Sequence, residues 1–99
     1  MILVIEQRVR DFGEWKSAFE GHRAVQERHG MTHYVIYRDD EDPALVTVLA
    51  EFPVGAAVRG YLDEPSLGEV LRAGGLEGRT NFRFRRKIDE VDLRRGAAA

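Results

Sequence analysis

The sequence predicts a single α+β domain of four strands and two helices in the order βαββαβ, with the second helix split in two. Runs of β-favouring residues alternate along the chain with segments whose apolar residues recur at helical spacing. Proline and glycine mark the ends of these segments, and one strand is apolar on both faces. We expect residues 1–90 to form the domain and residues 91–99 to form a C-terminal tail.

The first part of the chain predicts a strand followed by a long helix. Residues 2–9 alternate well enough for a strand. Asp11 can cap the next helix, and Glu14 three residues later gives the pattern of a capping box. We expect this helix over residues 12–28, with Gly30 as its C-terminal glycine.

One face of this helix carries its large side chains. Residues that follow one another at about 100° per residue form a stripe along an α-helix, and an apolar stripe faces the core. The members of the stripe are Phe12, Trp15, Phe19, His22 and Gln26.

A hairpin is expected next. The strands are residues 32–38 and 44–52, and both are rich in β-favouring side chains. Residues 39–43 between them are acidic and end in proline. They lack the glycine and the ligand spacing of a calcium loop, so we interpret them as a polar turn.

The remaining elements are a split helix and a fourth strand. Pro53 can open one short helix and Pro65 a second, because proline is tolerated at the first helical position. Gly74 and Gly75 end the second helix, and the fourth strand is expected over residues 78–88. Two helices on one face of a four-stranded antiparallel sheet give the ferredoxin-like arrangement.

The apolar residues of the third strand predict a homodimer. Residues 44–50 are apolar on both faces, as are residues 1–5 and, less completely, residues 33–37. Helices from one short chain cover only one face of the sheet. We expect the sheet of a second copy to cover the other face and complete a barrel of two subunits.

Composition excludes several classes of protein. The net charge is −2, and the basic cluster of residues 83–87 alternates with Phe82 and Phe84, which favours the solvent face of a strand over a nucleic-acid site. The chain has no cysteine, so disulfides and thiolate chemistry are excluded. The apolar start, residues 1–5, is too short for a signal peptide or a membrane span, and we expect a cytoplasmic protein.

Several stretches resemble the dimeric α/β-barrel superfamily, above all its small antibiotic-biosynthesis monooxygenase-like and cyclase-like proteins. They are residues 9–19, 37–43, 64–67 and 72–78. The resemblance implies a pocket between sheet and helices in each subunit. It does not fix a reaction, because the superfamily includes cofactor-independent monooxygenases, polyketide cyclases, haem-degrading enzymes and muconolactone isomerase-like proteins.

His22 and Tyr61 are the candidate catalytic residues. His22 lies on the same helical stripe as Trp15 and Phe19, so it can act as a base or donor within an apolar pocket, or be a core-edge histidine satisfied by the backbone. Tyr61 lies on the apolar side of the next helix and can supply a second polar group. Trp15 and Phe19 are expected to be either core residues or walls that stack a planar substrate.

His33 and Tyr37 are further candidates for substrate binding, with water exposure at the sheet end as the alternative for His33. His29 closes the long helix, where a cation suits the helix dipole, and we interpret it as structural. A metal held by His22 and His29 is not expected, because seven residues separate them by about 10 Å along a helix.

We expect a small-molecule enzyme that oxidises or cyclises an aromatic or polyketide-like compound without a bound cofactor. No glycine-rich loop follows a strand, so a phosphate cradle for flavin or nicotinamide is missing from the sequence. Haem on His22 is a less favoured alternative, because Phe12, Trp15 and Phe19 fill the same side. A non-catalytic ligand-binding or accessory dimer is the competing function.

Overall fold

The computed structural model describes residues 1–94 and has eight regular elements. Residues 95–99 of the expected tail lie outside the described residues. In chain order the elements are β1 (Ile2–Val9), α1 (Phe12–Gly21), α2 (Arg23–Arg28), β2 (His33–Arg38), β3 (Leu45–Glu51), α3 (Gly55–Leu62), α4 (Leu67–Arg72) and β4 (Leu76–Arg85).

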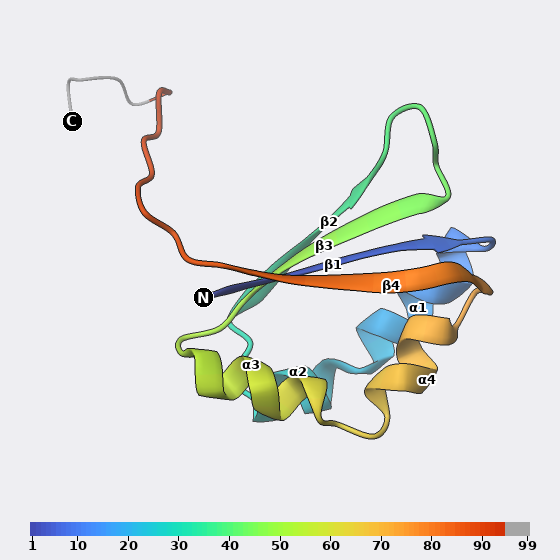
Figure 1. Ribbon diagram of the computed structural model, residues 1–99, viewed down its shortest axis with the longest axis horizontal. Helices are drawn as coiled ribbons and strands as arrows, with labels where there is room; N and C mark the ends of the chain where they lie inside the picture. Colours follow the sequence, from blue (N-terminus) through green and yellow to red (C-terminus); the bar gives the residue numbers. More distant parts are fainter. Residues whose placement is uncertain (95–99) are drawn as a thin grey trace.

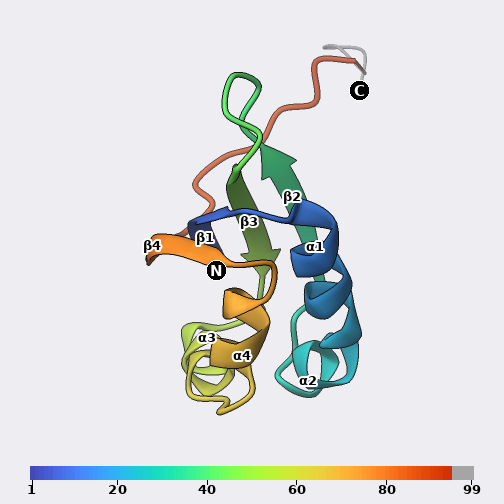
Figure 2. The same ribbon diagram turned by 90° about the vertical axis from the view of Figure 1, so that its right-hand side faces the viewer.

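The four strands form one antiparallel sheet in the order β2-β3-β1-β4. All four helices lie on one face of it (Figure 1). Seen from the side, α1 and α2 form one column and α3 and α4 a second column beside it (Figure 2). The predicted ferredoxin-like order βαββαβ, with its split second helix, is confirmed.

The helix expected over residues 12–28 is two helices, because the chain leaves helical geometry at His22. Asp11 caps α1 as predicted, accepting a hydrogen bond from the Glu14 backbone amide at 3.0 Å. The His22 amide then donates to Phe19 at 3.2 Å, three residues back, and its ψ of 11° ends α1. The sequence pattern missed this break, since the stripe of large residues continues through it.

The core lies between the sheet and the helices. One set of alternate residues on β1 and β3 is fully buried there, as the period of two along a strand requires. The buried apolar residues are Leu3, Ile5, Val9, Trp15, Phe19, Val46, Val48, Ala50, Phe52, Val58, Tyr61, Leu67 and Leu71.

The opposite face of the sheet carries no helix among the described residues. In the strand register Val35 on β2 pairs with Leu49 on β3, which pairs with Val4 on β1. These three side chains form an apolar row across the helix-free face, and each is partly exposed in the single chain. Ile2 lies beside this row, so the two-faced apolarity expected of the sheet is present.

The last strand differs from its expected position in the sequence. β4 runs over Leu76–Arg85, two residues earlier than predicted at its start. Its pairing shifts against β1, so that Phe82 and Phe84 pair with core residues of β1 and lie on the helix side, although they are 40% and 49% exposed. Arg83 and Arg85 therefore lie on the helix-free face, at its β4 margin.

The turn before β4 offers a test of the packing between that turn and the start of α1. Gly74 and Gly78 both have φ of +79°. A Cβ on Gly74 would overlap the Asp11 backbone oxygen and come within 3.0 Å of Trp15, whereas a Cβ on Gly78 meets nothing within 4 Å. We expect Gly78→Ala to cost about 1–2 kcal/mol of unfolding free energy, from the left-handed backbone alone. Gly74→Ala should cost about 1–3 kcal/mol more.

Urea unfolding of the two variants measures this difference, with Gly78→Ala as the matched control. Equal destabilisation would contradict the close packing of the turn against α1.

Candidate functional site

A buried polar cluster forms where α1 gives way to α2. His22 is only 6% exposed. Its Nε2 lies 2.8 Å from Oγ of Ser66, the residue before α4, and its Nδ1 lies 3.4 Å from the hydroxyl of Tyr61 on α3. The break in the helix therefore places the imidazole between two hydroxyl groups from the other helical column.

The environment keeps the imidazole neutral near pH 7. Burial lowers the pKa of His22 from its ordinary value of 6.5, and Glu64 opposes that change. Burial also raises the pKa of Tyr61 to about 12, so its phenol stays protonated. A neutral imidazole beside a protonated phenol can accept one proton and orient a second hydrogen bond.

Gln26 lies next to this cluster on α2 and is 2% exposed. Its amide nitrogen donates to the backbone oxygen of Phe19 at 3.1 Å, which fixes the orientation of the side chain. The Gln26 amide also opposes the effect of burial on the pKa of Tyr61. Its Oε1 nevertheless has no hydrogen-bond partner within ordinary distance limits among the described residues.

Trp15 and Phe19 lie in the core of the protein. Both are fully buried, and their rings stack with centroids 5.1 Å apart. The Trp15 indole N–H donates to Gln7 Oε1 at 2.9 Å, and Gln7 in turn donates to the Leu71 backbone oxygen at 2.6 Å. In this structure these side chains occupy the space where the sequence suggested a planar ligand, so their role as substrate walls stays a prediction.

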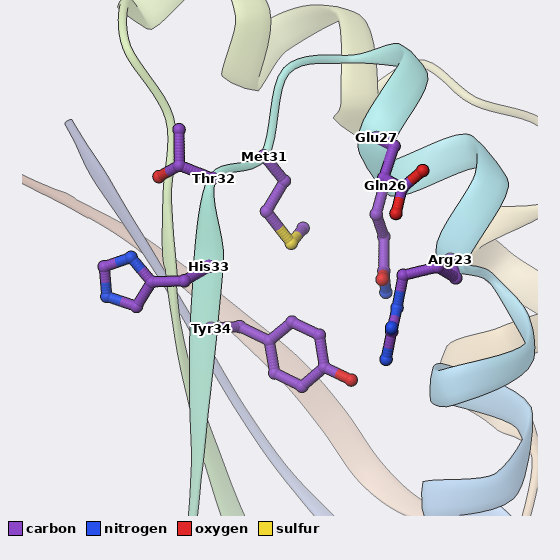
Figure 3. Close-up of a pocket in the computed structure, with 7 residues that line it drawn as sticks. All are labelled: Arg23, Gln26, Glu27, Met31, Thr32, His33 and Tyr34. Atoms are coloured by element: carbon purple, nitrogen blue, oxygen red, sulfur yellow. The ribbon is translucent and has the colours of Figure 1, made fainter.

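The open cavity lies farther along the same helical column, between α2 and the start of β2. It has a volume of about 340 Å³. Figure 3 shows the Gln26 amide, the Arg23 guanidinium and the Tyr34 hydroxyl directed toward one space. The lining residues are Arg23, Gln26, Glu27, Met31, Thr32, His33 and Tyr34.

The structure separates the predicted binding residues. His33 borders the cavity at the start of β2, but its ring points to the side of the strand opposite Tyr34 (Figure 3). Tyr37 pairs with Thr47 on the helix-free face and is 54% exposed. The two side chains share the helix-free side of β2, because residues an even number apart on a strand face the same way, so neither ring enters the space between sheet and helices. His29 is bound to Glu64 at 2.9 Å, consistent with the structural role expected for it.

Three functional candidates escaped the sequence reasoning. Ser66 follows a proline, which is typical of the start of a helix. Nothing in the local sequence connects Ser66 with His22. Gln26 is on the predicted stripe, but its free acceptor is visible only in three dimensions. The sequence gives no sign that Arg23 differs from other exposed residues, because its place in the lining of the cavity is visible only in the structure.

Neither a metal site nor a membrane helix is found in residues 1–94. No three histidine or carboxylate side chains in that range gather in a way that could hold a metal ion. No helix described for those residues is long and apolar enough to cross a membrane.

Solved structures with this fold include proteins of antibiotic biosynthesis. A point mutant of SnoaB, a cofactor-independent oxygenase from Streptomyces nogalater, matches with a TM-score of 0.66 and 19% identity, over 90% of this chain and 96% of that one. The chain has the fold of these proteins. No protein-family model matches the sequence, and no curated protein gives a significant match.

Two further structures support the same conclusion about the fold. A protein from Bordetella bronchiseptica, provisionally named an antibiotic biosynthesis monooxygenase, has a TM-score of 0.71 at 13% identity, over 88% of this chain and 96% of its own. A similarly named protein from Deinococcus radiodurans has a TM-score of 0.60 at 11% identity, over 93% and 99%. The resemblance to monooxygenase-like proteins is therefore confirmed at the level of the fold.

The lowered pKa of His22 predicts how stability depends on pH. The folded protein takes up this proton at a lower pH than the unfolded chain, whose histidine titrates near 6.5. The unfolded state therefore binds more protons in this window, and the His22 contribution to stability is lost as pH falls through 6.5 and below. We expect His22→Gln to remove this part of the pH dependence.

Urea unfolding of the parent protein and of His22→Gln at pH 7.5 and at pH values down to 5 measures the pH dependence of the free energy of unfolding. A variant with the same pH dependence as the parent protein would contradict the assignment to His22.

Proposed function

We propose that the protein is a small-molecule enzyme that oxidises or cyclises an aromatic or polyketide-like compound without a bound cofactor. The observation that carries the proposal is a buried imidazole held between the hydroxyls of Ser66 and Tyr61. Each ring nitrogen faces a hydroxyl, so the imidazole is held in one orientation with a polar group on either side. The fold shared with a cofactor-independent oxygenase supports the same class of reaction.

In the proposed reaction His22 removes a proton from an activated CH₂ group next to an aromatic ring. The resulting carbanion gives an electron to O₂, and the two radicals combine to form a C–O bond. The peroxide takes a proton, and loss of the second C–H proton then breaks the O–O bond. The products are a carbonyl and water, so one O₂ is consumed for each CH₂ that becomes C=O. In a cyclisation, the same carbanion instead attacks a carbonyl within the substrate.

The other two members of the cluster have distinct proposed roles. Tyr61 keeps its proton at neutral pH, and its buried hydroxyl lies 3.4 Å from His22 Nδ1, where it orients the imidazole. Ser66 is half-buried, whereas His22 and Tyr61 are buried, so Ser66 is the member nearest to solvent. It can pass a proton between the imidazole and a substrate docked beside α4.

A non-catalytic ligand-binding dimer is the second candidate. The observation that favours it is the complete burial of Trp15 and Phe19, which leaves no room for a substrate between them and the sheet. On this alternative, the polar cluster around His22 holds the two helical columns together, and the cavity between α2 and β2 holds a ligand.

We propose that the protein is a homodimer in which the helix-free faces of two sheets pack together. Burial of one partly exposed Val or Leu contributes up to about 1.5–3 kcal/mol to the stability of the dimer. Each of the two copies would bury its own row of Val4, Val35 and Leu49. The margins of this face support the same occupant. Arg83 and Arg85 lie along β4 on this face, and Glu51 lies nearer β2 on it, so two copies related by a twofold axis can pair opposite charges.

Anthrone, an aromatic ketone with an activated CH₂ group, is a suitable probe of the proposed reaction. We expect oxygen uptake with formation of anthraquinone, measured with an oxygen electrode and by absorbance. His22→Ala should lower the rate by about 10²–10⁴-fold, the usual contribution of a general base. The matched control is His29→Gln, which removes a histidine bound to Glu64. Full turnover by His22→Ala would remove His22 from its proposed role.

The dimer is tested by placing a charge in the apolar row. Leu49→Glu should give a monomer at micromolar concentration, because a carboxylate buried between two sheets costs several kcal/mol. Light scattering measures the mass. The control is Arg59→Glu on α3, a charge change on the helix side that should leave the dimer intact. A parent protein that is already monomeric at this concentration would refute the proposed dimer.

A further inference from the structure

We propose that the cavity between α2 and β2 is a binding site for a planar aromatic acid that carries a hydroxyl beside its carboxylate. This site is separate from the cluster around His22, and the proposal does not depend on turnover. Its volume of about 340 Å³ holds a ligand of one or two rings. Three features of its lining define the ligand.

The first feature is a buried acceptor without a partner. Gln26 is 2% exposed, and its Nε2 is already bound to the Phe19 backbone oxygen at 3.1 Å. That bond leaves Oε1 as the free end of the amide, in a residue that lines the cavity. A buried acceptor left unpaired is unfavourable, because it has lost its hydrogen bond to water. A hydroxyl hydrogen on the ligand would satisfy it.

The second feature is a cation without an ion pair. The exposed Arg23 guanidinium also lines the cavity and forms no ion pair or side-chain hydrogen bond with any residue in 1–94. Its planar fork matches a carboxylate with two parallel hydrogen bonds. Both residues line one cavity, and Figure 3 shows the guanidinium and the Gln26 amide directed toward the same space, so a single ligand with adjacent hydroxyl and carboxylate groups can meet both.

The third feature is an apolar wall. Tyr34 is half-buried, and its ring is fixed by an edge-on contact with Phe19 at 5.0 Å between centroids. Met31 lines the same cavity with an adaptable thioether. An aromatic ring packs well against both side chains, which favours an aromatic acid over a small aliphatic one.

The other charged group directed at the cavity limits the ligand to one negative charge. Glu27 lies four residues after Arg23 and contributes a carboxylate to the lining. His33 borders the cavity, but its ring points to the opposite side of β2, where Glu51 lies at 3.7 Å (Figure 3). A phosphate or a dicarboxylate would meet more repulsion from the Glu27 carboxylate than a monocarboxylate does, so we infer a singly charged acid.

Three small probes separate the contributions of hydroxyl and carboxylate. They are 2-hydroxybenzoate, benzoate and 2-hydroxybenzyl alcohol, titrated into ¹⁵N-labelled full-length protein and followed by NMR. We expect 2-hydroxybenzoate to shift the amide signals of residues 23–27 and 31–34. It should bind roughly tenfold more tightly than either other probe, since each lacks one polar partner worth about 1.4 kcal/mol.

Variants test the two polar partners separately. Arg23→Gln should weaken 2-hydroxybenzoate to the level of the neutral alcohol and leave the alcohol unchanged. Glu27→Gln should strengthen 2-hydroxybenzoate, because it removes a repelling carboxylate. Arg59→Gln on α3 is the control and should change neither. Gln26→Leu should weaken 2-hydroxybenzoate to the level of benzoate. If that variant does not fold, the comparison of the two acids on the parent protein tests the same hydrogen bond.

Three results would overturn the proposal: no shifts at the cavity at millimolar 2-hydroxybenzoate, equal affinity for benzoate, or no effect of Arg23→Gln. The same titration on His22→Ala separates this site from the proposed catalysis. Binding that persists in His22→Ala supports an independent site, even if no oxygen uptake is found with anthrone. Loss of binding in a folded His22→Ala protein would refute the separation of the two sites.

Discussion

The fold depends on the hydrogen bonds of one polar side chain, which the first strand places in the core between sheet and helices. Gln7 is on the buried face of β1 and is 2% exposed. It accepts from the Trp15 indole on α1 and donates to the Leu71 backbone on α4, so one amide joins three elements. An unpaired amide at this position would cost about 1–3 kcal/mol, so α1 and α4 must both pack at fixed positions over β1. The two helical columns, and every group held between them, follow from that requirement.

The polar cluster around His22 also joins the two helical columns by side-chain hydrogen bonds, farther from the centre of the sheet. The imidazole comes from the first column, and the two hydroxyls come from the second. It therefore serves both as a structural connection and as a proposed base. The two roles are compatible, because a base that must stay neutral and oriented is best held by groups that the fold already fixes.

The sequence predicted the order of strands and helices along the chain, because hydrophobic periodicity and turn residues mark each element. The stripe from Trp15 to Gln26 is buried as expected. The break at His22 was missed, since a stripe with a period of 3.6 residues does not reveal one residue that leaves helical geometry. The proximity of His22 and Tyr61 followed from two apolar helix faces meeting. Ser66 could not be foreseen, because it reaches His22 only through the packing of the two columns.

The interruption between α1 and α2 has a consequence for how this protein can change in evolution. Because the chain leaves helical geometry at His22, the six residues of α2 need not continue the axis of α1. α1 carries the fully buried aromatic residues, whereas α2 contributes only Gln26 to the buried set, with Val25 partly buried against the core. Substitutions in α2 can therefore alter what the cavity accepts while the core stays intact. The break divides one helical segment into a buried support and a short, more exposed unit in which new ligand preferences can arise at little cost to stability.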